Sequence, residues 1–255
     1  MTRPTLIVFA RVPAIGVGKS RLARDIGRVE AWRLSRALLD RALRRLRDPR
    51  WDVVVRVTPD RFSFPLVGKE VPACRSESEG PCRRMRGTRH GSAEVASPPQ
   101  SSAQEPAQPA AAPVRGAFFL HKGERVEPQG GGDLGARLTR AIRAHARGAV
   151  MVVGTDAPGL GGGHVAAGFA SARRHGAAIG PAADGGFWGL ALSPGRARRV
   201  DLSGVRWSGP HACEDTVAAL GGGVVRLATL IDVDDLAALR AWRDSSAAGR
   251  GGGPW

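Results

Sequence analysis

Asp156 occupies a position in this sequence where an acid can do chemistry, because it directly follows a short apolar run. Residues Ala149–Val153 predict a buried strand that Gly154 ends. Ligands of open α/β sheets bind where the chain leaves the carboxyl ends of strands. An aspartate at that point can hold Mg²⁺ or Mn²⁺, which bridges phosphate oxygens. The alternative is that Asp156 only caps the turn that Pro158 and Gly159 form.

A second candidate site is the loop RVPAIGVGKSRL, which follows a predicted strand at residues 5–10. Its glycines allow a ligand to approach the backbone, and its basic side chains supply charge for a diphosphate. The candidate nucleotide-binding residues are Arg11, Gly16, Gly18, Lys19 and Arg21. The loop is similar to a P-loop, but Pro13 stands where that pattern needs its first glycine, and proline has no N–H for a phosphate. A modified P-loop and a simple glycine turn with exposed basic residues both stay open.

Two further acidic positions could complete the site. Asp184 lies in the segment ADGG between two predicted strands, where it could be a second metal ligand, an acceptor of a sugar hydroxyl or a catalytic base. The alternative for Asp184 is a tight turn. Asp232 and Asp234 spell a DxD pair, but Asp234 comes at a predicted helix start, so we interpret it as an N-cap.

Polar and aromatic residues elsewhere are weaker candidates. Gln129 and Asp133 bracket three glycines, and the amide could read a base or sugar edge; the alternative is a flexible loop followed by an N-cap at Asp133. Trp207 could stack on an acceptor and Ser208 could hydrogen-bond it, although a tryptophan is more often buried. The histidines show no ligand spacing, and we assign them nothing.

The elements that must position these residues alternate between strands and helices. Expected strands cover residues 5–10, 51–57, 117–120, 149–153, 177–180, 187–192 and 224–227. Expected helices cover residues 21–47, 134–147, 163–175 and 233–242, with one more inside the segment VRWSGPHACEDTVAAL. The opening strand–loop–helix–strand order is typical of a doubly wound α/β sheet.

One domain accounts for most of the chain. Residues from about 68 to 115 are rich in Pro, Ser, Ala, Gln and Arg and poor in large apolar residues, so we expect a disordered insertion there. We assign 1–244 to a single domain interrupted by this insertion, and 245–255 to a flexible tail. The remaining length is sufficient for one hydrophobic core.

Composition excludes several classes of protein. No apolar run approaches a membrane span, and the short run at residues 6–10 does not make a signal peptide. Three cysteines without a CxxC spacing favour a reducing, cytoplasmic setting. The net charge of +15 comes almost entirely from arginine, while aromatic residues make up 5% and tyrosine is absent. This composition disfavours a nucleic-acid partner, and we interpret the arginines at 41–47 as a solvated helix face.

The order and spacing of several motifs resemble a known bacterial family. The motifs are FARVPAIGVGKSRLARDIG, PQGGGDLGARL, GTDAPGL, GPAADGGFWGLAL, VRWS and IDVDDLAAL. Together they resemble the rSAM/selenodomain-associated transferases, which have the glycosyltransferase A (nucleotide-diphospho-sugar transferase) fold. The matching positions are Arg11, Gly16, Lys19 and Arg21 in the first loop, then Gln129, Asp133, Gly135, Asp156, Pro158, Asp184, Gly185 and Gly186.

The resemblance implies a single Rossmann-like glycosyltransferase A domain, with a mixed, mostly parallel sheet flanked by helices. It also implies a nucleotide or nucleotide-sugar substrate near the first loop and a divalent metal, Mg²⁺ or Mn²⁺. An aromatic pair and an acidic segment depart from the family pattern. Phe187 and Trp188 replace its usual pair of tyrosines on the acceptor side, and the acidic segment at 232–236 is shortened.

The combined prediction is a metal-dependent transferase with a nucleotide-activated donor. Asp156 and Asp184 are the predicted catalytic residues and metal ligands, and the basic first loop receives the diphosphate. Whether a glycosyl or a nucleotidyl group moves stays open. The alternatives are a P-loop-like ATP-dependent kinase, which would need Ser20, and a non-catalytic arginine-rich nucleic-acid-binding protein.

Overall fold

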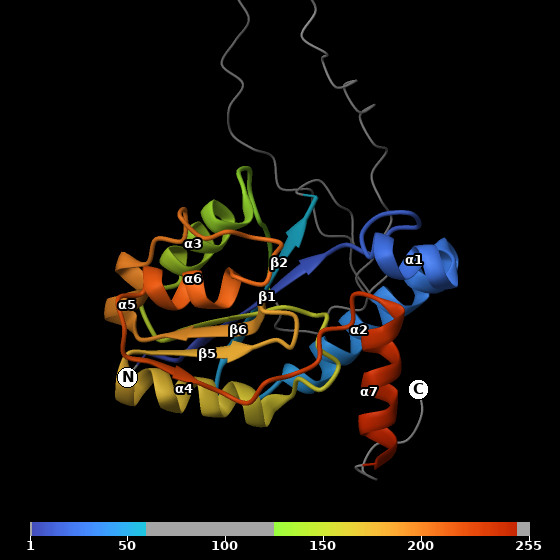
Figure 1. The fold of residues 1–255 in the computed structure, drawn as a ribbon. Helices are drawn as coiled ribbons and strands as arrows, with labels where there is room; N and C mark the ends of the chain where they lie inside the picture. The colour runs from blue at the N-terminus through green and yellow to red at the C-terminus, as the bar shows by residue number, and fades with distance from the viewer. Residues whose placement is uncertain (1, 60–124, 249–255) are drawn as a thin grey trace, which may run out of the picture.

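The computed structural model describes residues 2–59 and 125–248, whose arrangement Figure 1 shows. The strands are β1 (Thr5–Arg11), β2 (Asp52–Thr58), β3 (Arg125–Pro128), β4 (Val150–Val153), β5 (Ala177–Pro181), β6 (Phe187–Leu192) and β7 (Val224–Arg226). The helices are α1 (Ser20–Ile26), α2 (Arg28–Leu46), α3 (Leu134–Ala144), α4 (Gly162–His175), α5 (Pro194–Arg199), α6 (Ala212–Ala219) and α7 (Leu236–Ala248). None of these helices has the length and apolar character that a membrane span requires.

The strands form one seven-stranded sheet in the order β3-β2-β1-β4-β6-β5-β7. Every strand in it runs in the same direction except β6, which is antiparallel to both β4 and β5. The central strands are almost continuously apolar because helices cover both faces of the sheet. The predicted mixed, mostly parallel sheet flanked by helices is therefore confirmed.

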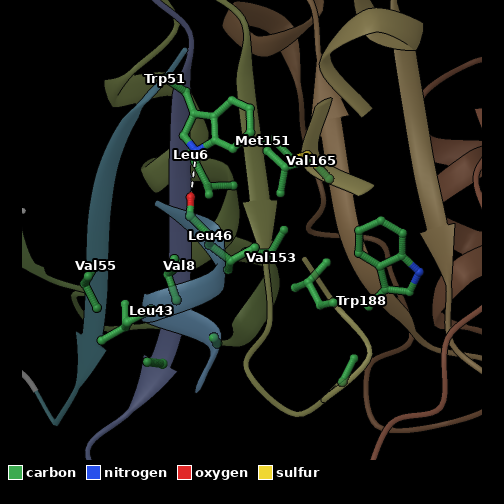
Figure 2. Close-up of a cluster of buried hydrophobic side chains, with 14 of the residues drawn as sticks. Leu6, Val8, Leu43, Leu46, Trp51, Val55, Met151, Val153, Val165 and Trp188 are labelled. Atoms are coloured by element: carbon green, nitrogen blue, oxygen red, sulfur yellow. Dashed lines mark hydrogen bonds between the residues drawn. The ribbon is translucent and has the colours of Figure 1, made fainter. Parts of the chain in front are cut away.

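Alternating strand residues divide the core between the two faces. Leu6 and Val8 of β1 pack with α2 and α4 on one face, whereas Ile7 packs with α3 and α5 on the other. Figure 1 shows the same division, with α2 and α4 on one side of the sheet and α3, α5 and α6 on the opposite side. Figure 2 shows the α2 face, where Trp51 donates its indole N–H to the Leu46 carbonyl at 2.8 Å.

A smaller apolar cluster lies beside the sheet, where α1, α2 and α7 meet (Figure 1). It consists of Leu22, Ala31, Val233 and Leu239, all buried. This cluster matters for function because Lys19 immediately precedes α1 and the acidic segment 232–235 immediately precedes α7. The packing of the two helices therefore brings these two segments together.

Several predicted boundaries are wrong. The single helix predicted over 21–47 is broken at Gly27, whose φ of +86° ends α1 and starts α2 in a new direction. The last helix begins at Leu236 instead of 233 and continues to Ala248, so the predicted boundary between domain and tail at 244 falls inside α7. Strand β3 and helix α5 were not predicted. The expected insertion at 68–115, the expected strand at 117–120 and the tail from 249 onward lie outside the described residues.

Candidate functional site

Three predicted site residues and Asp232 lie at the carboxyl edge of the parallel strands. Arg11 ends β1, Asp156 follows β4, Asp184 follows β5, and Asp232 follows β7. Parallel strands bring these positions to one edge although up to 221 residues separate them in the sequence, counting from Arg11 to Asp232. Asp156 and Lys19, which the predicted mechanism needs in one place, form an ion pair here.

The first loop bends tightly before it reaches Lys19. Val17 donates its backbone N–H to the Ala14 carbonyl at 3.1 Å, and Gly16 takes a φ of +80° within this turn. Gly18 has a φ of +72°, and a Cβ there would lie 3.3 Å from the Arg11 Cδ. Both glycines are thus required by the backbone path. Lys19 itself adopts a left-handed φ of +43°, which is unfavourable for a residue with a side chain.

The Lys19 ammonium contacts three oxygen atoms. Nζ lies 2.6 Å from Asp156 Oδ1, 2.6 Å from the Val233 carbonyl oxygen and 3.1 Å from Asp234 Oδ1. The lysine side chain is only 8% exposed. Burial alone would lower the pKa of Lys19, but the charges of Asp156, Asp234 and Asp232 outweigh it and raise the pKa. Lys19 is therefore a fixed positive charge at neutral pH.

Three carboxylates beside Lys19 form an acidic cluster consisting of Asp184, Asp232 and Asp234. One oxygen of each lies within 4.8 Å of the others. Burial, together with the charges of Asp156 and Asp234, raises the pKa of Asp232 to about 7, although Lys19 opposes this shift. Two or more carboxylates this close repel one another unless a cation lies between them.

The acidic cluster differs from the predicted metal site in two respects. Asp234 was interpreted as the N-cap of the last helix, but Asp235 has that role, because it accepts the Ala238 N–H at 2.8 Å. Asp234 is thus available to the cluster. Asp156 was predicted as a metal ligand beside Asp184, yet it lies outside the group of three and pairs with Lys19.

The donor set of the acidic cluster suits a hard divalent cation. All three side chains offer carboxylate oxygens, which Mg²⁺ and Mn²⁺ prefer, and no soft ligand is among them. Their net negative charge exceeds what Lys19 neutralises. The residues therefore fit the metal ion that the family resemblance implies.

Hydrogen bonds to backbone groups fix the positions of the loops that carry Asp156 and Asp184. Val233 donates its N–H to the Asp156 carbonyl at 2.9 Å, which ties the β4 loop to the segment before α7. Asp184 accepts the Gly186 N–H at 3.0 Å and closes its own turn. Gly185 has a φ of +88°, and a Cβ there would lie 2.4 Å from the Pro210 carbonyl oxygen. The ADGG motif thus needs a glycine for both conformation and space.

A cavity of about 150 Å³ opens beside Lys19. Its lining includes the polar residues Arg11, Lys19, Thr155, Asp156 and Asp234. The apolar residues Phe9, Pro13, Val17 and Leu39 also line it. Arg11 is exposed and pairs with no carboxylate in the ranges that the structure describes, so its guanidinium can meet an anionic ligand. Arg21 also points outward from α1 and is exposed.

Gln129 and Asp133, predicted to bind the nucleotide, are engaged within the protein. Gln129 is buried and donates both amide hydrogens to strand carbonyls, those of Ala10 at 2.9 Å and Arg56 at 3.1 Å. Its amide oxygen accepts from Arg137 at 3.0 Å. Asp133 caps α3 by accepting the Ala136 N–H at 2.7 Å, as the alternative interpretation expected. In this structure the Gln129 side chain links β1 to β2, and its amide has no donor left for a base.

The glycine after Asp133 in this motif also has a packing role. A Cβ on Gly135 would lie 2.3 Å from the Leu202 carbonyl oxygen and 2.9 Å from the Trp207 indole nitrogen. The match of Gly135 to the family motif is therefore explained by the close approach of α3 to the segment that precedes α6.

The residues predicted on the acceptor side divide into buried and exposed groups. Trp188 is 3% exposed, and its indole donates to the Ala228 carbonyl at 2.9 Å, so the acceptor-side prediction is wrong for Trp188. Figure 2 shows its ring among the core residues. Phe187 and Trp207 are partly buried and pack together with ring centroids 6.0 Å apart. Ser208 is exposed, with a φ of +63°.

Two arginines of α2 have a positioning role that the sequence did not reveal. Arg41 and Arg45 donate to the Pro158 carbonyl at 3.1 and 3.0 Å. They lie on the same side of the helix because they are four residues apart. The prediction of a solvated helix face is therefore incomplete for this pair: Arg41 is partly buried, and Arg45, although exposed, also helps to hold the loop that carries Asp156. The four-residue spacing was visible in the sequence, but their carbonyl partner was not.

Comparisons with known proteins agree with this fold. Residues 83–209 match a family described as "Uncharacterized protein conserved in bacteria (DUF2064)". A search of the curated proteins finds no match to the sequence. A crystal structure from Desulfovibrio desulfuricans G20, provisionally named a nucleotide-diphospho-sugar transferase, is similar with a TM-score of 0.67 and 19% identity, covering 98% of this chain and 90% of that one.

Two more distant structures share less of the architecture. A 2-C-methyl-D-erythritol 4-phosphate cytidylyltransferase from Thermus thermophilus has a TM-score of 0.43 and 19% identity, covering 97% of this chain and all of that one. Rv0371C from Mycobacterium tuberculosis H37Rv, in complex with manganese, has a TM-score of 0.42 and 14% identity, covering 96% of this chain and all of that one. Of these three structures, only the one from Desulfovibrio is similar enough to support an argument, and that argument concerns the fold.

Proposed function

We propose that this chain is a metal-dependent transferase that uses a nucleotide-activated donor and moves a glycosyl or a nucleotidyl group. The observation that carries the proposal is the placement of Lys19 against Asp156 and Asp234, on the wall of one cavity and beside the acidic cluster. Group transfer from an activated nucleotide needs positive charge to receive the phosphates and a cation to neutralise them. Both requirements are met within a few side chains of each other.

Each residue of the site has a distinct part in this proposal. The acidic cluster would hold Mg²⁺ or Mn²⁺, which supplies charge neutralisation at the phosphate oxygens of the leaving group when bound. Arg11 and Lys19 would donate hydrogen bonds to the same phosphates from the cavity wall. Asp156 would orient the Lys19 ammonium. Asp184, which is exposed, would accept a hydrogen bond from the acceptor hydroxyl.

The similarity to the Desulfovibrio structure supports the choice of substrate class. That protein is provisionally named a nucleotide-diphospho-sugar transferase, and its similarity to the present chain has a TM-score of 0.67. Together with the motif order, this favours a nucleoside diphosphate sugar over ATP as the donor. The P-loop alternative is weaker because Pro13 stands where that pattern needs its first glycine and provides no N–H for a phosphate.

Thermal unfolding in the presence of candidate ligands tests the proposal. Nucleotides and nucleotide sugars are added one at a time, with Mn²⁺ or with a chelator. A ligand at a hundred times its dissociation constant stabilises the protein by about 2.7 kcal/mol. For a domain of this size, that corresponds to an increase in melting temperature of several degrees. We expect Mn²⁺ alone to give a smaller increase, and we expect the nucleotide-dependent increase only when Mn²⁺ is present.

Substitution of Asp156 provides the specific control. Asp156→Asn should abolish the nucleotide-dependent increase while changing the melting temperature of the free protein little, because the Asp156 side chain is 44% exposed. Asp201→Asn removes the same charge from an exposed turn elsewhere and should leave the increase intact. A nucleotide response that survives in Asp156→Asn, or no response to any nucleotide with Mn²⁺, would contradict the proposal.

A further inference from the structure

The Lys19 ammonium has no hydrogen-bond donor left for a substrate in this structure. An ammonium group carries three N–H donors, and Nζ lies within hydrogen-bond distance of three oxygens, those of Asp156, Val233 and Asp234. The side chain is also 8% exposed. If Lys19 is to bind a phosphate, one of these three partners must be released.

Of the three partners of Lys19, Asp234 makes the weakest contact. Its contact of 3.1 Å is longer than the 2.6 Å contacts to Asp156 and to the Val233 carbonyl. Its side chain is also 51% exposed, so water can replace the lysine. Asp234 belongs to the acidic cluster as well, and it is the residue that Lys19 and a metal ion would share.

The charges around Lys19 are unbalanced without a further cation. The Asp232 carboxyl group lies near three other carboxyl groups, those of Asp156, Asp184 and Asp234, but near only one ammonium, that of Lys19. A divalent cation in the cluster would reduce this imbalance, but it would also repel the Lys19 ammonium. The ammonium and the metal ion therefore compete for the same negative charge.

We propose that Lys19 is the internal counter-ion of the metal-free site and exchanges Asp234 for a substrate phosphate once a divalent cation binds. Lys19 keeps its contacts with Asp156 and the Val233 carbonyl, so only one of its three hydrogen bonds changes partner. The exchange implies an order of binding, with the metal ion first and the nucleotide second. This inference rests on the proposed function, since it assumes a cation in the acidic cluster.

The first test measures Mn²⁺ affinity in the absence of nucleotide. Lys19→Met removes the competing charge and keeps a side chain of similar length, so we expect Mn²⁺ to bind about tenfold more tightly. With saturating Mn²⁺, the same variant should bind a nucleoside diphosphate about tenfold more weakly. Arg24→Gln is the matched control, because it removes one positive charge from exposed α1 without touching the cluster, and it should change either affinity by less than about twofold.

A second test follows Lys19 directly. The chain contains only three lysines, at positions 19, 69 and 122, so a variant with Lys69→Arg and Lys122→Arg has one lysine side-chain signal in an NMR spectrum. Titration with diamagnetic Mg²⁺ alone should shift this signal as Asp234 is released. A later addition of nucleoside diphosphate should shift it again.

The outcomes separate this inference from the proposed function. Equal Mn²⁺ affinity in the wild-type protein and Lys19→Met, or a Lys19 signal that stays in place while Mg²⁺ binds, would overturn the inference alone. Failure of the wild-type protein and the variant to bind any divalent cation would overturn the proposed function as well.

Discussion

Replacement of Asp232 by asparagine is expected to stabilise the metal-free protein at neutral and alkaline pH. Asp232 is partly buried beside Asp156 and Asp234, and burial together with these charges raises its pKa to about 7. The folded protein must therefore accept an unfavourable negative charge whenever the pH exceeds this value. Asparagine has nearly the same shape but cannot ionise.

The size of the effect follows from the difference in pKa between the folded and unfolded states. The carboxyl group has an ordinary pKa of 3.8 and a folded pKa of about 7, a difference of about three pH units. Each unit is worth about 1.4 kcal/mol, so the ionised Asp232 lowers the free energy of unfolding by at most about 4 kcal/mol. Because the neighbouring carboxyl groups readjust and solvent screens part of the charge, we expect about 2–4 kcal/mol.

The sign of the pH dependence is fixed by the same argument. Between pH 3.8 and 7 the folded state binds more protons at Asp232 than the unfolded state, so its contribution to stability falls as the pH rises. The advantage of Asp232→Asn should therefore be close to zero near pH 4, grow through this window and be complete above pH 7.

Urea denaturation of both proteins from pH 4 to 8, with a chelator present, measures the effect. Asp235→Asn serves as the control, since it removes the same charge from the same segment but retains an N-cap for α7. Addition of Mn²⁺ should reverse the order and stabilise the wild-type protein more than Asp232→Asn. The prediction fails if Asp232→Asn is less stable than the wild type at pH 8, or if the difference in stability between the two proteins is the same at all pH values.

Three further substitutions test the roles of residues around the site. Ser20→Ala should leave the Mn²⁺-dependent nucleotide response in thermal unfolding unchanged, whereas a P-loop enzyme would lose it. Gly180→Ala should lower the free energy of unfolding by about 3 kcal/mol or more in urea denaturation, because the added Cβ would lie 2.1 Å from the Trp188 ring. Gly163→Ala is the control: its added Cβ would meet nothing within 4 Å, so this variant should be neutral or slightly stabilising. Gln129→Leu should lower the free energy of unfolding by about 2–4 kcal/mol, since two strand carbonyls lose their donor. If the folded variant still responds to nucleotide, the role of Gln129 is structural.

Sequence patterns predicted most of the sheet because buried parallel strands have a local signature. Short runs of mostly apolar residues located β1, β4 and β6 within about one residue. The same reasoning missed β3, whose sequence RVEP is half polar and pairs at the edge of the sheet. It also missed the break at Gly27, because the residues on both sides of this glycine have helical patterns and one residue with positive φ does not change them.

Some residues of the candidate site could be predicted from the sequence, and others could not. Asp156, Lys19 and Asp184 were recognisable because each follows a predicted strand or lies in a glycine-rich turn, which is information local to the sequence. The role of Asp234 was not recognisable, because two adjacent aspartates are equally good N-caps until the start of α7 is known. The hydrogen bonds that Trp188 and the Gln129 amide nitrogen donate depend on neighbours more than 30 residues away.

The local sequence was sufficient to predict most of the strands, the acids and glycines that follow them, and the edge of the sheet to which they belong, because strand patterns and turns depend on residues that are close along the chain. Which charges meet depends instead on how the helices pack in three dimensions. Lys19 and Asp234 are 215 residues apart and come together because α1 and α7 bury Leu22, Val233 and Leu239 against each other. Electrostatic contacts of this kind depend on distances in space, and the packing of the helices sets those distances.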